Sequence, residues 1–299
     1  MTAAAAVSAD LRPWLDRVRL SAGSRLRGRG EGGRAARAAG FGLDLHGHRS
    51  YQPGDELRHL DWHALARLGA LVVREYRAEA APTLALLIDA SGSMSVGAPS
   101  KMASARRLAA ALGYLALREQ GRVALGVFGE RGRWVLPPVR GLGRLAELHE
   151  RLGSLAAAGP TDLRGSWTAL AGGLARVDLA VVVSDFLVEG LDVASVAALG
   201  LPGEAVVLLQ VLERDEVDPP EEEAELDDIE RRPGSPIAGL RVDASVVEAY
   251  RAAFLRQAAR LEAVARARRC RCATLLADDP PGHWLAAWLA AGIVTPRAA

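Results

Sequence analysis

The sequence predicts an α/β fold in which a mostly parallel β-sheet is flanked by helices. Apolar runs of strand length alternate with segments of helical periodicity along most of the chain. Aromatic residues make up only 5% of the 299 residues, so the core must consist mainly of Ala, Leu and Val. Helices rich in Ala and Leu that cover strands rich in Val and Leu suit this composition.

The predicted elements follow one another in an order that fits this fold. Strands are expected at 71–76, 84–89, 122–129, 133–138, 179–184, 204–212 and 272–277. Helices are expected from Ser100 to Gly121, at 142–155, 163–175 and 244–268, and around Trp284 and Trp288, which share one face and are assigned to the core. A Pro-flanked acidic run at about 218–236 breaks the alternation. It is interpreted as a solvated insertion, with an acidic docking surface as the alternative.

Three parts are expected along the chain. Residues 1–40 are predicted to form a mobile N-terminal helix and basic loop, because 21–40 is rich in Gly, Arg and Ala without apolar periodicity. Residues 41–80 form a second segment packed on the main α/β domain, which spans 81–299. A nucleic-acid-binding arm is the alternative for 21–40, but interleaved aromatic residues are missing there and the net charge of the chain is only +1.

The sequence favours a cytoplasmic protein. Cys270 and Cys272 are too close to form a low-strain disulfide within a strand, which fits free thiols in a reducing compartment. No apolar stretch reaches the roughly 20 residues of a membrane span, and the first residues lack the basic start and apolar core of a signal peptide. Lys101 is the only lysine among the 37 basic residues, a bias that is attributed to codon usage.

An oxygen-rich turn follows the strand at 84–89. Asp89 ends the apolar run, and Ser91 and Ser93 follow at alternate positions. A buried strand that ends in such a turn places these side chains at the carboxyl edge of a sheet, where α/β folds bind ligands. One carboxylate and two hydroxyls suit a hard divalent cation such as Mg²⁺. The alternative is that these residues only close a turn and cap a helix.

Two distant residues strengthen the metal interpretation. Asp185 ends a second Val-rich run, so a parallel sheet would present it at the same edge as Asp89. Thr161 lies in the turn after Gly159 and Pro160, where either Thr161 or Asp162 is a candidate cap for the next helix.

This set resembles the metal-ion-dependent adhesion site of von Willebrand factor A domains, in which an Asp-x-Ser-x-Ser motif is joined by a later Thr and a later Asp. The matching residues are Asp89, Ser91, Ser93, Thr161 and Asp185. The resemblance implies that the serines and the threonine bind Mg²⁺ (or Mn²⁺) directly or through water and that the aspartates supply charge. It also implies that a carboxylate of a partner protein completes the metal shell.

A second motif resembles the signature of the domain-of-unknown-function family 58, whose pattern precedes a von Willebrand A-like domain. It runs through Arg49, Tyr51, Pro53, Gly54, Asp55, Arg58, Asp61, Trp62, Ala66 and Arg67. Alternating charges in this segment predict a structural Arg/Asp network around Trp62. The resemblance covers about residues 40 to 290. It implies an adaptor or co-chaperone that engages a MoxR-type AAA+ ATPase, or its client, through the metal.

Two other functions are alternatives to this non-enzymatic interaction module. A magnesium-dependent hydrolase also places an Asp at a strand end beside a hard metal. The sequence lacks a second carboxylate two residues after Asp89, a Gly-rich phosphate loop and a nucleophile elbow. Nucleic-acid binding through 21–40 has the least support of the three.

Overall fold

The computed structural model divides the chain into two units. Unit 1 comprises Met1–Arg25 together with Pro82–Ala299, and unit 2 comprises Leu26–Ala81. The structure describes residues 10–21, 43–53, 55, 60–78, 82–219, 225–226, 240–241 and 243–297.

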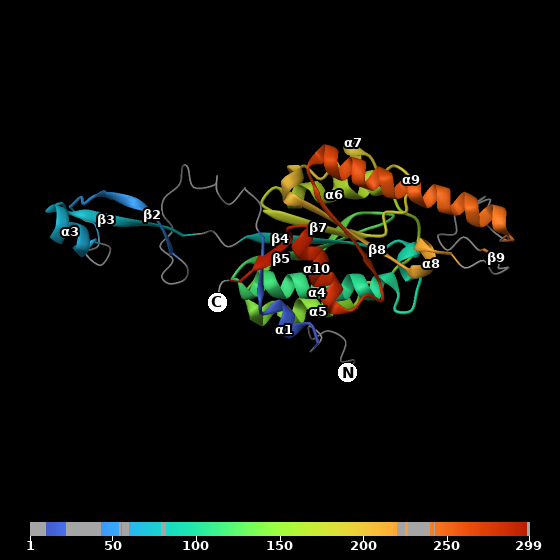
Figure 1. Cartoon of the computed structure of the whole chain (residues 1–299), viewed down its shortest axis with the longest axis horizontal. Coiled ribbons are helices and arrows are strands. Elements are labelled where there is room, and N and C mark those ends of the chain that lie inside the picture. The colour runs from blue at the N-terminus through green and yellow to red at the C-terminus, as the bar shows by residue number, and fades with distance from the viewer. Residues whose placement is uncertain are drawn as a thin grey trace. The chain divides into compact units, whose positions relative to one another are not determined.

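A six-stranded sheet forms the centre of unit 1 (Figure 1). In spatial order its strands are β11 (Arg271–Leu276), β8 (Val206–Leu212), β7 (Leu179–Ser184), β4 (Thr83–Asp89), β5 (Arg122–Phe128) and β6 (Arg133–Arg140). The first five run parallel, and β6 pairs antiparallel with β5 at the edge of the sheet. Two consecutive prolines, Pro137 and Pro138, lie in this edge strand. β4, β7 and β8 are buried along their whole length, as expected when helices cover both faces.

Helices cover both faces of this sheet (Figure 1). α4 (Lys101–Arg118), α5 (Leu145–Gly153) and α10 (Pro281–Ala290) pack on one face, and α6 (Leu163–Leu174), α7 (Val193–Ala197) and α9 (Ala244–Arg268) pack on the other. Along β4, Leu86 joins the core under α4 and Leu87 joins the core under α6. Trp284 and Trp288 of α10 are buried, as predicted. The arrangement confirms the expected von Willebrand A-like α/β fold.

In the part of the chain that the structure describes, no helix combines the length and the apolar character needed to cross a bilayer.

Cys270 and Cys272 are free and half-buried, and burial raises the pKa of each thiol to about 11.

Residues 10–21 pack on unit 1, although they were expected within a mobile N-terminal stretch. They form α1 (Arg12–Leu15) and β1 (Val18–Leu20), and β1 pairs antiparallel with β12 (Val294–Pro296). Leu15 is fully buried, and Arg118 of α4 donates hydrogen bonds to the carbonyl oxygens of Leu15 (3.0 Å) and Val18 (2.6 Å). The sequence pattern did not show this packing, because the few apolar residues at 10–21 stand next to a Gly- and Arg-rich stretch. The basic loop at 22–40 lies outside the described residues.

Short elements flank the predicted acidic insertion. α8 (Arg214–Val217) follows β8 directly, and β9 (Glu225–Leu226) pairs antiparallel with β10 (Leu240–Arg241). Tyr250 of α9 donates its hydroxyl hydrogen to the carbonyl oxygen of Glu216 at 2.9 Å, which ties α8 to α9. Most of the acidic run lies outside the described residues, so its docking role stays a prediction. Among the described residues of unit 1, single 3-10 turns lie at η2 (Gly92–Ser95), η3 (Leu142–Arg144) and η4 (Gly203–Ala205).

Unit 2 is built on a β-hairpin. β2 (Leu43–Ser50) pairs antiparallel with β3 (Val72–Ala78), and α3 (Trp62–Leu68) lies between them in sequence. Asp61 caps α3, because its Oδ1 accepts hydrogen bonds from the backbone N–H groups of His63 (3.0 Å) and Ala64 (3.1 Å). Arg49 and Asp55 form a bidentate pair at 2.6 and 2.7 Å. The hydrogen bond from Arg49, followed by one from the Gln52 backbone, lowers the pKa of Asp55 to about 2.

The Arg/Asp network expected around Trp62 stays a prediction, since part of the signature lies outside the described residues. Trp62 directly follows the cap of α3 and is 59% exposed, whereas Leu60 and Val73, which form a β-bridge, are buried. Tyr51 is half-buried, whereas Pro53, Ala66 and Arg67 are exposed. Gly54 and Arg58 lie outside the described residues. The packing of this segment on the main domain stays a prediction.

Candidate metal site

The candidate site lies at the point where the strand order of the sheet reverses. From β4 the chain continues to β5 on one side and later returns to β7 on the other side. Loops that leave two such neighbouring parallel strands diverge and open a crevice at their carboxyl ends. The register pairs Ile88 with Val183, so Asp89 and Ser184 come next to each other. Ser184 donates its hydroxyl hydrogen to Asp89 Oδ2 at 2.5 Å.

The Asp-x-Ser-x-Ser turn is folded by its own hydrogen bonds. The backbone N–H of Ser91 donates to Asp89 Oδ1 at 2.9 Å. The hydroxyl oxygens of Ser91 and Ser93 lie 3.1 Å apart. Ser95 closes the turn by donating its hydroxyl hydrogen to the carbonyl oxygen of Gly92 at 2.7 Å. Asp89 and Ser91 are buried and Ser93 is half-buried, so one carboxylate and two hydroxyls converge with limited contact to solvent.

Backbone hydrogen bonds attach the loop of Thr161 to this turn. The N–H of Gly92 donates to the carbonyl oxygen of Gly159 at 2.8 Å, and the N–H of Ala158 donates to that of Ala90 at 2.9 Å. Asp162, not Thr161, caps α6, because its Oδ1 accepts a hydrogen bond from the N–H of Gly165 at 2.9 Å. The half-buried Thr161 therefore lies in a loop that is fixed beside the turn but has no role as the helix cap.

Asp185 is fixed at the end of β7 by three contacts. Its Oδ1 accepts a hydrogen bond from the N–H of Leu187 at 3.0 Å, and its Oδ2 accepts one from Lys101 Nζ at 2.7 Å. Gln210 of β8 donates from Nε2 to the carbonyl oxygen of Asp185 at 2.9 Å. The next residue, Phe186, has a φ of 50°, a left-handed conformation that is unusual for a bulky side chain. Its backbone is held by Ser184 Oγ, which accepts a hydrogen bond from the Phe186 N–H at 2.9 Å.

The site contains the buried carboxylates of Asp89 and Asp185, whose negative charges are only partly compensated by nearby positive charge. Burial raises the pKa of Asp89 to about 7, and the negative charge of Asp185 adds to this rise. Hydrogen bonds from Ser184 and Ser91 offset part of it. A divalent cation bound by these oxygens would supply the missing charge, and carboxylates and hydroxyls are ligands that Mg²⁺ accepts. Within the described ranges, no group of three or more His, Cys, Asp or Glu is placed to hold a metal, and the candidate site itself contributes two carboxylates.

Sequence comparison assigns the chain to a family. The model of a family described as "Protein of unknown function DUF58" matches residues 47–263, which is more than half of the chain. The chain belongs to the DUF58 family. This match confirms the family that the Arg49–Arg67 motif suggested, and it includes most of the hairpin unit and the sheet strands that carry the candidate site. No curated protein matches this DUF58 chain.

Several solved structures are similar to the DUF58 chain at low sequence identity. An aerotolerance-related membrane protein from Bacteroides fragilis is 18% identical, with a TM-score of 0.40 over 62% of this chain and 99% of that one. The conserved hypothetical protein BatB from Bacteroides thetaiotaomicron is 14% identical, with a TM-score of 0.43 over 70% and 98% of the two chains. A von Willebrand factor type A structure from Catenulispora acidiphila is 21% identical, with a TM-score of 0.35 over 62% and 44%. The strand order and connections of the DUF58 chain themselves define its fold.

Two residues of the DUF58 site were not singled out as candidates from the sequence. Ser184 directly precedes Asp185, but it was counted only as the last residue of a strand. Lys101 was noticed only as the sole lysine and attributed to codon usage. Its side chain is fully buried against Asp185, which lies 84 positions away in the sequence. The sequence feature that points to Lys101 is its position: it is the single lysine of an arginine-rich chain, and it stands at the start of the helix that follows the Asp-x-Ser-x-Ser turn.

The hydroxyl of Ser184 is expected to control the proton affinity of Asp89. We predict that Ser184→Ala raises the pKa of Asp89 above about 7, because the mutation removes a hydrogen bond that stabilises the ionised carboxylate. A ¹³C NMR titration of the aspartate carboxyl carbons, recorded in a chelator, measures the change. Ser195→Ala removes another buried hydroxyl, in α7, and serves as the control that should leave this titration unchanged. An unaltered Asp89 titration in Ser184→Ala would show that this hydrogen bond does not hold the carboxylate.

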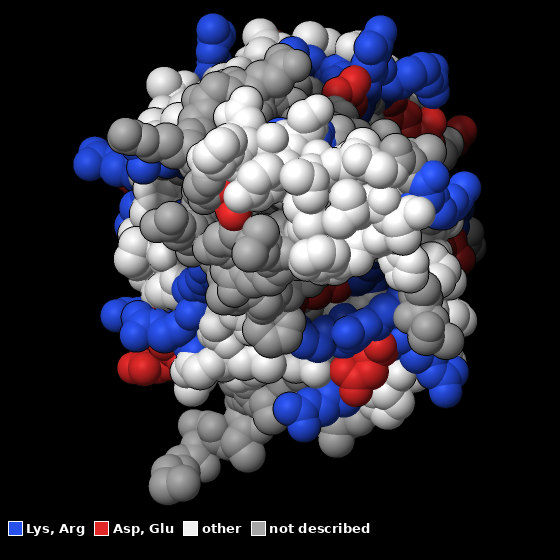
Figure 2. All heavy atoms as spheres, turned by 90° about the vertical axis from the view of Figure 1, so that its left-hand side faces the viewer, with Lys and Arg blue, Asp and Glu red and all other residues white. Residues whose placement is uncertain are grey.

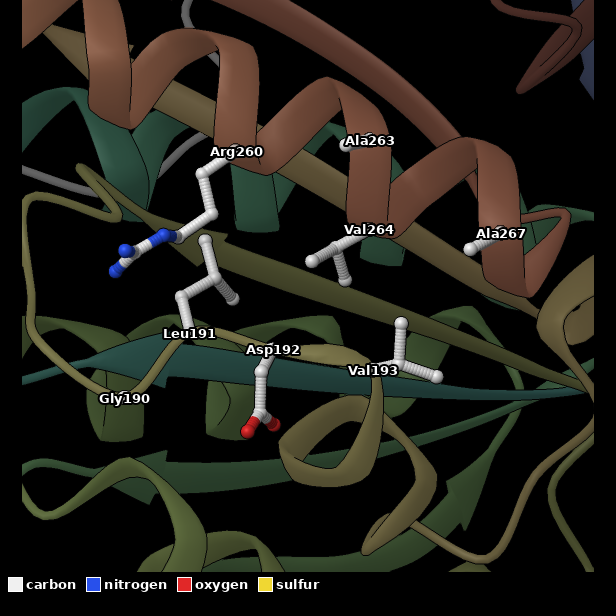
Figure 3. Close-up of a pocket in the computed structure, with 8 residues that line it drawn as sticks. All are labelled: Gly190, Leu191, Asp192, Val193, Arg260, Ala263, Val264 and Ala267. Atoms are coloured by element: carbon white, nitrogen blue, oxygen red, sulfur yellow. The ribbon is translucent and has the colours of Figure 1, made fainter.

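A shallow groove of about 510 Å³ lies between the start of α7 and α9 of the DUF58 chain (Figure 3). Its lining residues are Gly190, Leu191, Asp192, Val193, Arg260, Ala263, Val264 and Ala267. The carboxylate of Asp192 is used to cap α7, since it accepts a hydrogen bond from the N–H of Ser195 at 2.6 Å. None of the predicted metal ligands lines this groove, so it is separate from the candidate site.

Proposed function

We propose that this protein is a metal-dependent protein-interaction module. A von Willebrand A-like fold is consistent with such a module. In our proposal Mg²⁺, or Mn²⁺ in its place, binds at Asp89, Ser91, Ser93, Thr161 and Asp185. The observation that supports it best is the raised pKa of the buried Asp89 beside Asp185, since this pair of carboxylates calls for a cation at the switch point of the sheet.

The donor set explains why a bound metal would attract a partner. Lys101 already neutralises part of the charge of Asp185 at a distance of 2.7 Å, so Asp89 is the carboxylate most available to the ion. Hydroxyl ligands carry no formal charge, and a divalent ion among them keeps much of its positive charge. A carboxylate from another protein can then complete the shell, which makes the metal a contact point.

The partner that we propose is a MoxR-type AAA+ ATPase or its client protein, acting in the cytoplasm. This part of the proposal is supported by the family resemblance alone. Nucleic acid is a weaker candidate partner. Figure 2 shows Lys and Arg side chains of the described residues in several separate places in this view, with Asp and Glu beside some of them. The net charge of the chain is only +1, whereas nucleic-acid-binding domains are commonly strongly basic.

The first test is direct metal binding. Isothermal titration of the purified chain with MgCl₂ at pH 8 is expected to show one saturable site, and Asp89→Ala is expected to abolish it. Glu262→Gln removes an exposed carboxylate of α9 outside the site and should bind Mg²⁺ like the wild type. Loss of Mg²⁺ binding in both variants, or in neither, would argue against a metal at Asp89.

The second test is partner binding. The wild-type chain is expected to retain a MoxR-type ATPase of the same organism in a pull-down with Mg²⁺ and to lose it when the metal is chelated. Asp89→Ala should fail to retain it under both conditions. Equal retention in all four experiments would contradict a metal-dependent contact.

A further inference from the structure

Lys101 is a buried cation next to the candidate metal site. It is the first residue of α4, directly after the Asp-x-Ser-x-Ser loop, and its side chain is 0% exposed. Nζ donates to Asp185 Oδ2 at 2.7 Å and also to Oε1 of Glu216 in α8. Burial of an ammonium group is costly unless charged partners compensate for it. Here desolvation lowers the pKa of Lys101, but the charges of Asp185 and Glu216 outweigh it and the net pKa is raised.

The position of Lys101 matters because it shares a carboxylate with the proposed metal. Asp185 binds Lys101 through Oδ2 and is close enough to Asp89 to raise the pKa of that group. Lys101 therefore reaches Asp185 from the start of α4, and Glu216 of α8 contacts the same ammonium group. A compact ammonium point charge suits this enclosed position better than the wide, planar guanidinium that supplies all other basic side chains of the chain.

We propose that Lys101 is the resident cation of this site: it balances Asp185 and Glu216 when no metal is bound and limits how tightly a divalent cation binds. The inference rests on the proposed metal site at Asp89 and Asp185. With Lys101 in place, the carboxylates of Asp185 and Glu216 stay compensated and the site stays folded when no metal is bound. The metal can then bind and dissociate reversibly. Lys101 is thus a positioning residue for Asp185.

Replacement of Lys101 should make the stability of the folded protein depend on a bound divalent cation. In Lys101→Met, Asp185 and Glu216 lose their shared positive partner, and a divalent cation becomes the main source of compensation. Removing the positive charge of Lys101 also removes its repulsion of a bound ion, so we expect Lys101→Met to bind Mg²⁺ more tightly than the wild type, by at least about tenfold.

The experiment compares the thermal unfolding of wild type and Lys101→Met at pH 8. Each is measured in a chelator, in 5 mM MgCl₂ and in NaCl of matched ionic strength. The Tm of Lys101→Met is expected to fall in the chelator and to rise with Mg²⁺ by several degrees more than the Tm of the wild type. The double variant Lys101→Met/Asp185→Asn removes both charges and should respond less to Mg²⁺ than Lys101→Met. A Mg²⁺ response of Lys101→Met no larger than that of the wild type overturns the proposal.

A second measurement does not depend on the folding of the variant. Because Lys101 is the only lysine, wild-type protein labelled with ¹³Cε,¹⁵Nζ-lysine gives a single side-chain ammonium signal. We expect this signal to move with added MgCl₂ and to saturate together with the calorimetric binding curve. Mg²⁺ binding that leaves the signal unmoved overturns the role of Lys101 but keeps the metal site. If Mg²⁺ binds to Lys101→Met but not to the wild type, the role of Lys101 is supported and the proposed metal-dependent function fails. If Mg²⁺ binds to neither protein, the role of Lys101 and the proposed function both fail.

Discussion

Trp167→Ala is expected to lower the free energy of unfolding of unit 1 by about 3–5 kcal/mol, the usual cost of removing a large aromatic side chain from a core. Trp167 is fully buried in α6, and its ring meets that of Phe128 edge-on with centroids 5.9 Å apart. Urea unfolding followed by circular dichroism measures the loss. Because α6 begins directly after the loop of Thr161, we also expect weaker Mg²⁺ binding in this variant.

Trp62→Ala provides the matched control for this prediction. The same change at a side chain that is 59% exposed should alter the free energy of unfolding by no more than about 0.5 kcal/mol. If the two tryptophan variants lost similar stability, the assignment of Trp167 to the core and of Trp62 to the surface would both be wrong.

The metal-free protein is expected to become less stable as the pH rises from about 4 to about 7. Asp89 has a pKa of about 7 in the folded chain and an ordinary value of 3.8. Between these values the folded state holds a proton that the unfolded state has released, so stability is fully present at lower pH and is lost as Asp89 ionises. The full difference corresponds to roughly 4 kcal/mol.

Urea unfolding in a chelator at pH 5 and pH 8 measures the part of this loss that falls above pH 5, about 3 kcal/mol. Asp89→Asn removes the titrating group and should show a smaller difference between the two pH values than the wild type. Saturating Mg²⁺ should stabilise the wild type more at pH 8 than at pH 5, because the ion binds the carboxylate form. A wild type whose pH dependence equals that of Asp89→Asn would mean that Asp89 is not protonated near neutral pH.

The fold was predictable because its strands are buried on both faces. Such strands appear as continuous Val- and Leu-rich runs, and the alternation of these runs with helices specifies a parallel sheet. The N-terminal residues 10–21 were misjudged because their few apolar anchors stand beside a Gly- and Arg-rich stretch. The exposure of Trp62 was also missed, since charge alternation in sequence does not show which side chain a short helix leaves outside its core.

The sequence indicated where the candidate site would form but not how its charges are balanced. Strand ends alone place Asp89 and Asp185 at one edge, and the structure has them close enough to interact. The contacts of Lys101 with Asp185 and Glu216 depend on side-chain reach across the sheet edge, over 84 and 115 positions of sequence. No local pattern encodes such contacts. Metal binding by Thr161 and its companions stays a prediction that the proposed titrations address.

The two prolines of β6 limit how other chains can associate with this border of the sheet. The register between β5 and β6 shifts at Pro137 and Pro138, and neither residue has a backbone N–H to donate. A second polypeptide added outside β6 would therefore meet an interrupted row of donors, and cross-β stacking through this border is disfavoured. At that border, recognition through side chains and loops is favoured over backbone pairing.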